Sequence, residues 1–152
     1  MSFTRSTSNW IIAVAATASI GVATASLAQG HEHAGHAGDT AGLELNQGKK
    51  WATDEPLRKG MKAIQTLVAE AGPHPGPEQS ARLAAGLRAQ VNYLVANCKL
   101  EPKADAVLHV LIGRILTGAA SLADGTTAES GLATVKDALQ LYPQYFDHPN
   151  WR

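Results

Sequence analysis

Three of the six histidines in this chain, His31, His33 and His36, lie within one stretch of six residues near the N-terminus. Imidazole nitrogens are ligands for copper, nickel and zinc. The surrounding residues, 29–42, are mainly glycine and alanine with one Glu and one Asp, a composition that cannot bury a core. We therefore expect a flexible, histidine-rich tail that binds a metal ion. The alternative is a solvated linker whose histidines are incidental.

The tail also contains a candidate site for Cu(II). If the chain is cleaved after Ala28, the mature protein begins with Gln29, Gly30 and His31. A free amine, two deprotonated amides and an imidazole place four nitrogens in a square, an arrangement that suits Cu(II) or Ni(II). Cyclisation of Gln29 would remove the amine. Copper is the ion that the tail favours.

Softer donors occur in the body of the chain. Cys98 is the only cysteine, so an internal disulfide is excluded, and the thiol is buried, paired with another chain, or a ligand. Together with His109 and Met61 it would suit Cu(I). Asp105 precedes His109 by one helical turn, where it could hold the ring nitrogen that does not bind the metal. The competing interpretation makes Cys98 and Met61 core residues and His109 a half-exposed packing residue.

Four stretches have the apolar periodicity of helices and short connections between them. They run from about residue 54 to 71, 77 to 98, 102 to 124, and 126 to a helix end or kink at Pro143. The apolar stripes expected to form the core are Leu57, Met61, Ile64 and Val68; Leu83, Leu87, Val91, Leu94 and Val95; Val107, Leu108, Leu111, Ile112, Ile115, Ala119 and Leu122; and Leu132, Val135, Leu139 and Tyr142. Thr53 or Asp54 would cap the first helix, and Thr126 with Glu129 would form a capping box for the fourth. No stretch alternates with period two, so no strands are expected. The sequence predicts an all-α, up-down-up-down four-helix bundle over residues 43–152.

This topology brings most of the candidate ligands to one end of the bundle. The starts of helices 1 and 3 and the ends of helices 2 and 4 meet there, with Trp51, Cys98, Asp105, Tyr145, Phe146, His148 and Trp151. Met61 and His109 each lie about seven residues into their helices, roughly 10 Å from that end. The aromatic side chains, Tyr142 among them, are expected to cover the open end as a hydrophobic plug.

The first 28 residues resemble a secretory signal peptide. Residues 1–8 are polar with one basic side chain, Arg5, residues 10–25 are apolar without charge, and Ser26 and Ala28 fit the cleavage site. A membrane anchor is the alternative, but the apolar run is about 16 residues, whereas a span needs roughly 20. We expect a soluble periplasmic or secreted protein, cleaved after Ala28 and without a stable membrane span after processing.

Charge and motifs restrict the possible functions. Loss of Arg5 on cleavage leaves 12 basic against 13 acidic side chains, so nucleic acid is not an expected partner. The sequence has no zinc-protease HExxH, no haem-attaching CxxCH, no paired-cysteine zinc site and no phosphate-binding glycine loop. No spacing suggests a catalytic triad. An enzyme is therefore not expected.

Several blocks of sequence resemble a family of small exported bacterial proteins designated DnrO-like. The blocks are Leu45–Met61, Asn97–Pro102, Ala104-Asp105 and Leu108-His109, and the resemblance spans about residues 45 to 151. It implies export but no activity that can be transferred. In outline the fold is also similar to cytochrome b562 type bundles, which hold haem between a Met and a His. Met61 and His109 would have those roles, but they come from diagonal rather than adjacent helices.

Three functions therefore stay open. The favoured one is an exported protein that binds copper, through the tail and through Cys98, His109 and Met61. The second is a non-catalytic adaptor that binds another periplasmic protein, with Cys98 buried. The third, and least favoured, is a haem-binding bundle.

Overall fold

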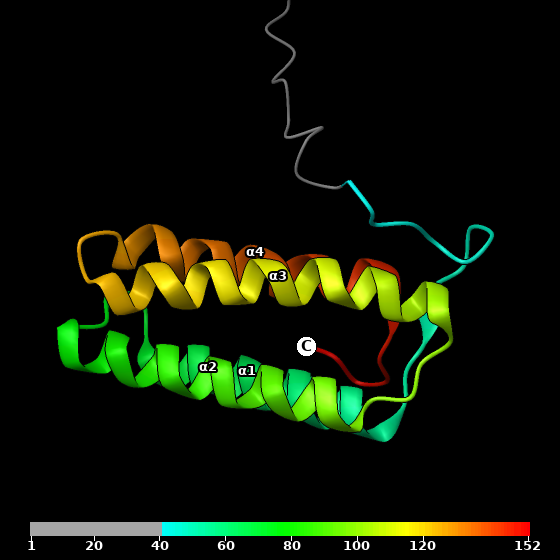
Figure 1. Cartoon of the computed structure of the whole chain (residues 1–152), viewed down its shortest axis with the longest axis horizontal. Coiled ribbons are helices and arrows are strands. Elements are labelled where there is room, and N and C mark those ends of the chain that lie inside the picture. The colour runs from blue at the N-terminus through cyan, green and yellow to red at the C-terminus, as the bar shows by residue number, and fades with distance from the viewer. Residues whose placement is uncertain (1–40) are drawn as a thin grey trace, which may run out of the picture. The chain divides into compact units, whose positions relative to one another are not determined.

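In the computed structural model, which describes residues 41–152, four helices make up most of the chain. They are α1 (Glu55–Ala71), α2 (Pro77–Asn97), α3 (Pro102–Asp124) and α4 (Ala128–Tyr145). Figure 1 shows α1 beside α2 in one layer and α3 beside α4 in the other, with short connections between consecutive helices. The predicted all-α four-helix bundle is confirmed. The predicted signal peptide and His31, His33 and His36 lie outside the described residues.

Most predicted helix starts are confirmed, and each has a local cause. Asp54 caps α1, since its Oδ1 accepts a hydrogen bond from the Leu57 amide at 2.8 Å. Pro77 and Pro102 occupy the first turns of α2 and α3, where a proline costs no hydrogen bond. Gly125, with a φ of 78°, ends α3 in the left-handed region that glycine tolerates best.

The predicted details of α4 are partly wrong. Thr127, not Thr126, is the N-cap, and no side chain caps this helix. Thr126 instead donates its hydroxyl to Asp124, so the predicted box with Glu129 does not form. The helix also continues past Pro143 to Tyr145. A proline this close to the C-terminus removes one backbone bond, which the packing of the last turn offsets.

The apolar stripes predicted from the sequence form the core, with one exception. Val95 was expected in the stripe of α2, but it is 61% exposed. It follows Leu94, which is fully buried, by about 100° around the helix and so faces outward. The other predicted stripe residues are buried: Leu57, Met61, Ile64, Val68, Leu83, Leu87, Val91, Leu94, Val107, Leu108, Leu111, Ile112, Ile115, Ala119, Leu122, Leu132, Val135, Leu139 and Tyr142.

Helix α3 is apolar enough in length and composition to cross a membrane, with a mean hydropathy of 1.7 over its most apolar window. In the bundle this helix packs between α2 and α4. Its backbone meets that of α4 at Gly118 and Gly131, where an added Cβ on either glycine would lie within 2.7 Å of the other's carbonyl oxygen. The apolar character of α3 is therefore accounted for by its central place in the core.

Two very short strands contradict the prediction that the chain has none. β1 (Trp51–Ala52) pairs in parallel with β2 (Phe146–Asp147), with Trp51 opposite Phe146. Two residues are too few to produce an alternating pattern in the sequence. The pair joins the start of α1 to the segment that follows α4.

The last seven residues, 146–152, which we term the C-terminal strap, turn back over the bundle. Figure 1 shows this segment running back from the end of α4 between the two layers of helices. The Gln65 amide on α1 donates to the Arg152 carbonyl at 2.7 Å, and the Trp151 ring contacts the ring of Tyr142 on α4. The strap therefore lies along the seam between α1 and α4, which make little direct contact with each other.

Candidate functional site

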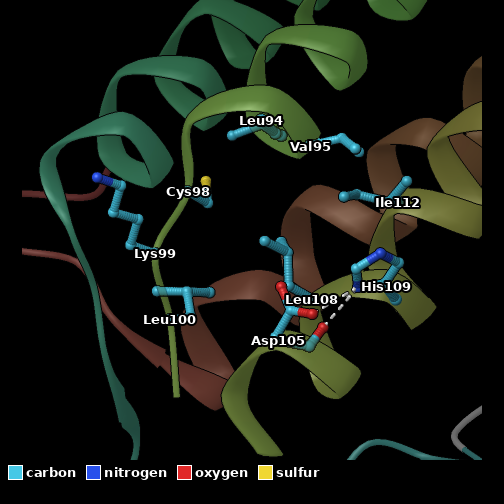
Figure 2. A pocket seen from close by; sticks show the side chains of 9 residues that line it. All are labelled: Leu94, Val95, Cys98, Lys99, Leu100, Asp105, Leu108, His109 and Ile112. Atoms are coloured by element: carbon cyan, nitrogen blue, oxygen red, sulfur yellow. Dashed lines mark hydrogen bonds and ion pairs between the residues drawn. The ribbon is translucent and has the colours of Figure 1, made fainter. Parts of the chain in front are cut away.

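A cavity of about 310 Å³ lies between the end of α2 and the start of α3. Figure 2 shows Cys98 on the α2 side of this cavity and Asp105 and His109 on the α3 side. We call it the Cys98 pocket. It is lined by Leu94, Val95, Cys98, Lys99, Leu100, Asp105, Leu108, His109 and Ile112. The fold thus brings three of the predicted site residues to one pocket.

His109 is oriented by the helical turn before it. Its Nδ1 lies 2.9 Å from the carbonyl oxygen of Asp105 and 3.3 Å from the Asp105 Oδ2. A carbonyl oxygen can only accept a hydrogen bond, so Nδ1 carries the proton in the neutral ring and Nε2 holds the lone pair. The side chain is 57% exposed. This is the arrangement in which a histidine binds a metal through one nitrogen while a neighbour fixes the other.

Cys98 lies at the point where the chain leaves α2. Its amide still donates to the Leu94 carbonyl at 2.9 Å, but its own backbone is extended. The side chain is partly buried against the core. Burial, together with the negative charges of Asp54 and Asp105, raises the pKa of the Cys98 thiol to about 12. The same negative charges would favour a cation beside the sulfur.

Asp54 positions the segment that carries Cys98, a role that the sequence did not reveal. While its Oδ1 caps α1, its Oδ2 accepts a hydrogen bond from the Lys99 amide at 2.6 Å. One carboxylate therefore joins the start of α1 to the connection between α2 and α3. The signal that could have indicated this is a capping aspartate at the same end of the bundle as an irregular connection.

Met61 does not share the pocket with Cys98 and His109. Its side chain is fully buried in the core, and it is not among the lining residues. Within residues 41–152, no three His, Cys, Asp or Glu side chains are grouped closely enough to hold a metal ion by themselves. The pocket as placed offers a thiol and an imidazole as its two principal donors.

A second polar cluster lies among residues that the sequence placed at this end of the bundle, but the hydrogen bond at its centre was not predicted. The Tyr142 hydroxyl lies 2.9 Å from His148 Nδ1, and the Trp151 ring packs on both residues, with centroids 4.8 and 5.0 Å away. Burial and the charge of Cys98 are among the causes that raise the pKa of Tyr142. Burial, Arg58 and Lys62 lower the pKa of His148.

The predicted gathering of aromatic side chains is confirmed in its main part. Phe146 stacks on Tyr142 with ring centroids 5.3 Å apart, and Trp51, which is 2% exposed, is fixed by its indole N–H donating to the Glu44 carbonyl at 2.7 Å. Tyr145 is only partly buried. Trp51 and Phe146 lie side by side at the predicted end, whereas Trp151 and the rest of the strap lie along the seam between α1 and α4 and do not close the end of the bundle.

No protein-family model, curated protein or solved structure matches the chain. The resemblance to DnrO-like proteins and to cytochrome b562 type bundles therefore stays a prediction. What the chain can do must be argued from its own residues.

Proposed function

We propose that this protein is exported and binds copper in the Cys98 pocket, with the Cys98 sulfur and the His109 Nε2 as ligands. The observation that carries the proposal is that both residues line one cavity while Asp105 fixes the other ring nitrogen of His109. Export rests on the signal-like segment of residues 1–28.

The donor set favours copper over other ions. Thiolates select soft ions such as Cu(I) and also bind zinc, and imidazole binds both. Structural zinc, however, takes four protein ligands in a tetrahedron. Cu(I) accepts two or three ligands, which is closer to what Cys98 and His109 provide. Binding replaces the thiol proton with the ion, so one proton is released for each Cu(I) bound.

The histidine-rich tail is a separate part of the proposal. With cleavage after Ala28, Gln29, Gly30 and His31 would bind Cu(II) through four nitrogens, and His33 and His36 would add further imidazoles. A His31→Ala variant should then lose the visible absorption of square-planar copper, roughly near 525 nm. Unchanged copper spectra in that variant would exclude the tail site and leave the pocket unaffected.

The adaptor function is a second candidate because large apolar side chains are exposed on two helices. Val95 is 61% exposed and Leu116 is 39% exposed, and both lie on the outer sides of α2 and α3. Haem binding is less favoured than either, since Met61 is fully buried and lies outside the pocket that contains His109.

Anaerobic titration with Cu(I) against a coloured chelator tests the pocket. We expect one tightly bound ion per chain in protein that lacks the tail histidines (His31→Ala, His33→Ala and His36→Ala combined). Adding Cys98→Ser should weaken binding by on the order of a thousandfold, beyond the 10–100-fold typical of residues that only orient ligands. The matched control is His74→Ala, which removes a histidine that is 79% exposed elsewhere. Equal affinities in all these proteins would reject the pocket as a copper site.

A further inference from the structure

The C-terminal strap is attached to the bundle by hydrogen bonds and by two rings, the buried Phe146 and the partly buried Trp151, which pack against the core. Besides the two-residue β pair, the Thr53 hydroxyl donates to the Asp147 carbonyl at 2.8 Å, and Gln65 donates to the Arg152 carbonyl at 2.7 Å. Between these two attachments lies His148, whose Nδ1 meets the Tyr142 hydroxyl. Detaching the strap breaks these bonds and separates Trp151 from the Tyr142 ring, and His148 contacts both of these residues.

The surroundings of His148 favour its neutral form. In the neutral ring the Tyr142 hydroxyl can donate to an unprotonated Nδ1. The charged groups that act on His148 are Arg58 and Lys62 of α1, and both are positive. From α4 the facing titratable group is Tyr142, which stays neutral at ordinary pH because its pKa is raised. A proton on His148 would thus enter a partly dehydrated site beside two cations and would lose the acceptor at Nδ1.

We infer that the C-terminal strap is an acid-released latch, in which protonation of His148 detaches residues 147–152 from the seam between α1 and α4. The inference goes beyond copper binding and does not depend on it. Its parts are the Tyr142–His148 bond, the two cations of α1, and the hydrogen bonds that attach the strap on either side of His148.

The direction of the pH effect follows from linkage. While the strap is attached, the pKa of His148 lies below its ordinary value of about 6.5, and release returns it to that value. The attached state is therefore most favoured above about pH 6.5 and loses stability as the pH falls toward the lowered pKa. Each unit by which the pKa is lowered corresponds to about a tenfold change in the ratio of attached to detached strap.

Release would uncover an aromatic surface. Tyr142 is fully buried, and Trp151 covers part of its ring. Leu139 and Pro143 of α4 line a cavity together with Trp151 and Arg152. Removing Trp151 from this cavity would expose apolar surface on α4 only under acidic conditions. An exported protein would thereby present a different surface in acidic and in neutral surroundings.

Hydrogen exchange measured by mass spectrometry tests the latch on the full mature chain. In wild-type protein the peptide covering residues 146–152 should lose protection between pH 7.5 and 5.0, after correction for the intrinsic pH dependence of exchange. The loss should be several-fold or more, while peptides from the middle of α3 keep their protection. In His148→Asn, whose amide can accept from Tyr142 but does not titrate, the strap should have the same protection at both pH values.

Three outcomes would overturn the inference. The first is constant protection of the strap in wild-type protein, and the second is a loss in His148→Asn as large as in wild type. The third is an equal loss in the strap and in α3, which would indicate unfolding of the whole bundle. Should His148→Asn not fold, Tyr142→Phe at the two pH values offers a second test, since it removes the bond but keeps the titrating ring. In Tyr142→Phe the protection of the strap against hydrogen exchange should still fall between pH 7.5 and 5.0, but from a lower starting value.

Discussion

Two histidines at the same end of the bundle show how differently one side chain can be used. His109 stands 57% exposed on α3 and lines the Cys98 pocket, with Nδ1 held by Asp105. His148 is partly buried, with Nδ1 bonded to Tyr142 and Trp151 packed against its ring. The first ring is oriented toward a cavity, and the second ring is part of an attachment.

The charges that act on the Cys98 pocket and on His148 have opposite signs. Negative charges from Asp54 and Asp105 act on Cys98 in the pocket, whereas positive charges from Arg58 and Lys62 act on His148. A cation would therefore be favoured in the pocket and disfavoured in the aromatic cluster. In the proposed copper site, the neighbouring charges and not the imidazole alone would select His109 over His148 as the ligand.

Exchanging the two histidines for alanine gives the largest expected effect. His109→Ala should weaken Cu(I) binding at the pocket by more than about 100-fold, a larger loss than substitution of a residue that only orients a ligand usually causes. His148→Ala should leave that affinity within about twofold. Competition with a Cu(I) chelator, in protein without the tail histidines, measures both. Similar losses in the two variants would remove the distinction between the sites.

The thiol of the metal-free protein should react slowly. With the pKa of Cys98 raised to about 12, the thiolate is scarce near pH 8, and alkylation should be about 100-fold slower in the folded than in the unfolded chain. Asp105→Asn removes one of the charges that raises this pKa and should speed the reaction. Iodoacetamide labelling followed by mass spectrometry gives the rates. Equally fast labelling of the folded and unfolded chains would contradict the account.

Removing the hydroxyl of Tyr142 should cost a moderate amount of stability. Tyr142→Phe leaves His148 Nδ1 without its partner in a partly buried place, a loss of about 1 kcal/mol in the free energy of unfolding. Tyr145→Phe is the matched control, since its ring is less buried and the structure places it outside the Tyr142–His148 bond. Urea unfolding at pH 7.5 compares the two. A Tyr145→Phe cost as large as that of Tyr142→Phe would show that the bond contributes little.

The smallest expected effect is on thermal stability at mildly acidic pH. Because the pKa of His148 is lowered in the folded chain, the wild type should lose stability as the pH falls through about 6.5. His148→Asn should lose less stability. Between pH 7.5 and 5.5 the melting temperature should therefore fall by a few degrees more in the wild type than in His148→Asn. Parallel changes in both proteins would show that other groups cause the acid sensitivity.

The helices could be predicted from the sequence because burial on one face repeats every three to four residues. The same argument placed Cys98, Asp105 and His109 at a shared end, which the structure confirms. The strap could not be predicted in this way, since its position depends on single contacts such as the bond between Tyr142 and His148. Val95 shows a further limit of sequence reasoning, because an apolar residue next to a buried one can still lie on the exposed side of its helix.

The roles of Asp54 and Met61 depend on three-dimensional detail that spacing does not contain. Asp54 was expected only to cap α1, but its second oxygen also holds the Lys99 amide. Met61 was expected about seven residues into its helix, at the level of His109. Its side chain is buried in the core and does not line the Cys98 pocket. Helical height and angle thus locate a residue to within a turn, while contact with a site depends on the packing around it.

X-ray absorption at the copper edge identifies the ligands of a bound ion, and it can be applied to protein without the tail histidines that is loaded with one Cu(I) per chain. We expect one sulfur neighbour and at least one imidazole nitrogen, with the sulfur signal lost in Cys98→Ser and the imidazole signal reduced in His109→Ala. A copper ion surrounded only by nitrogen and oxygen in the wild-type pocket, unchanged by either substitution, would contradict this expectation.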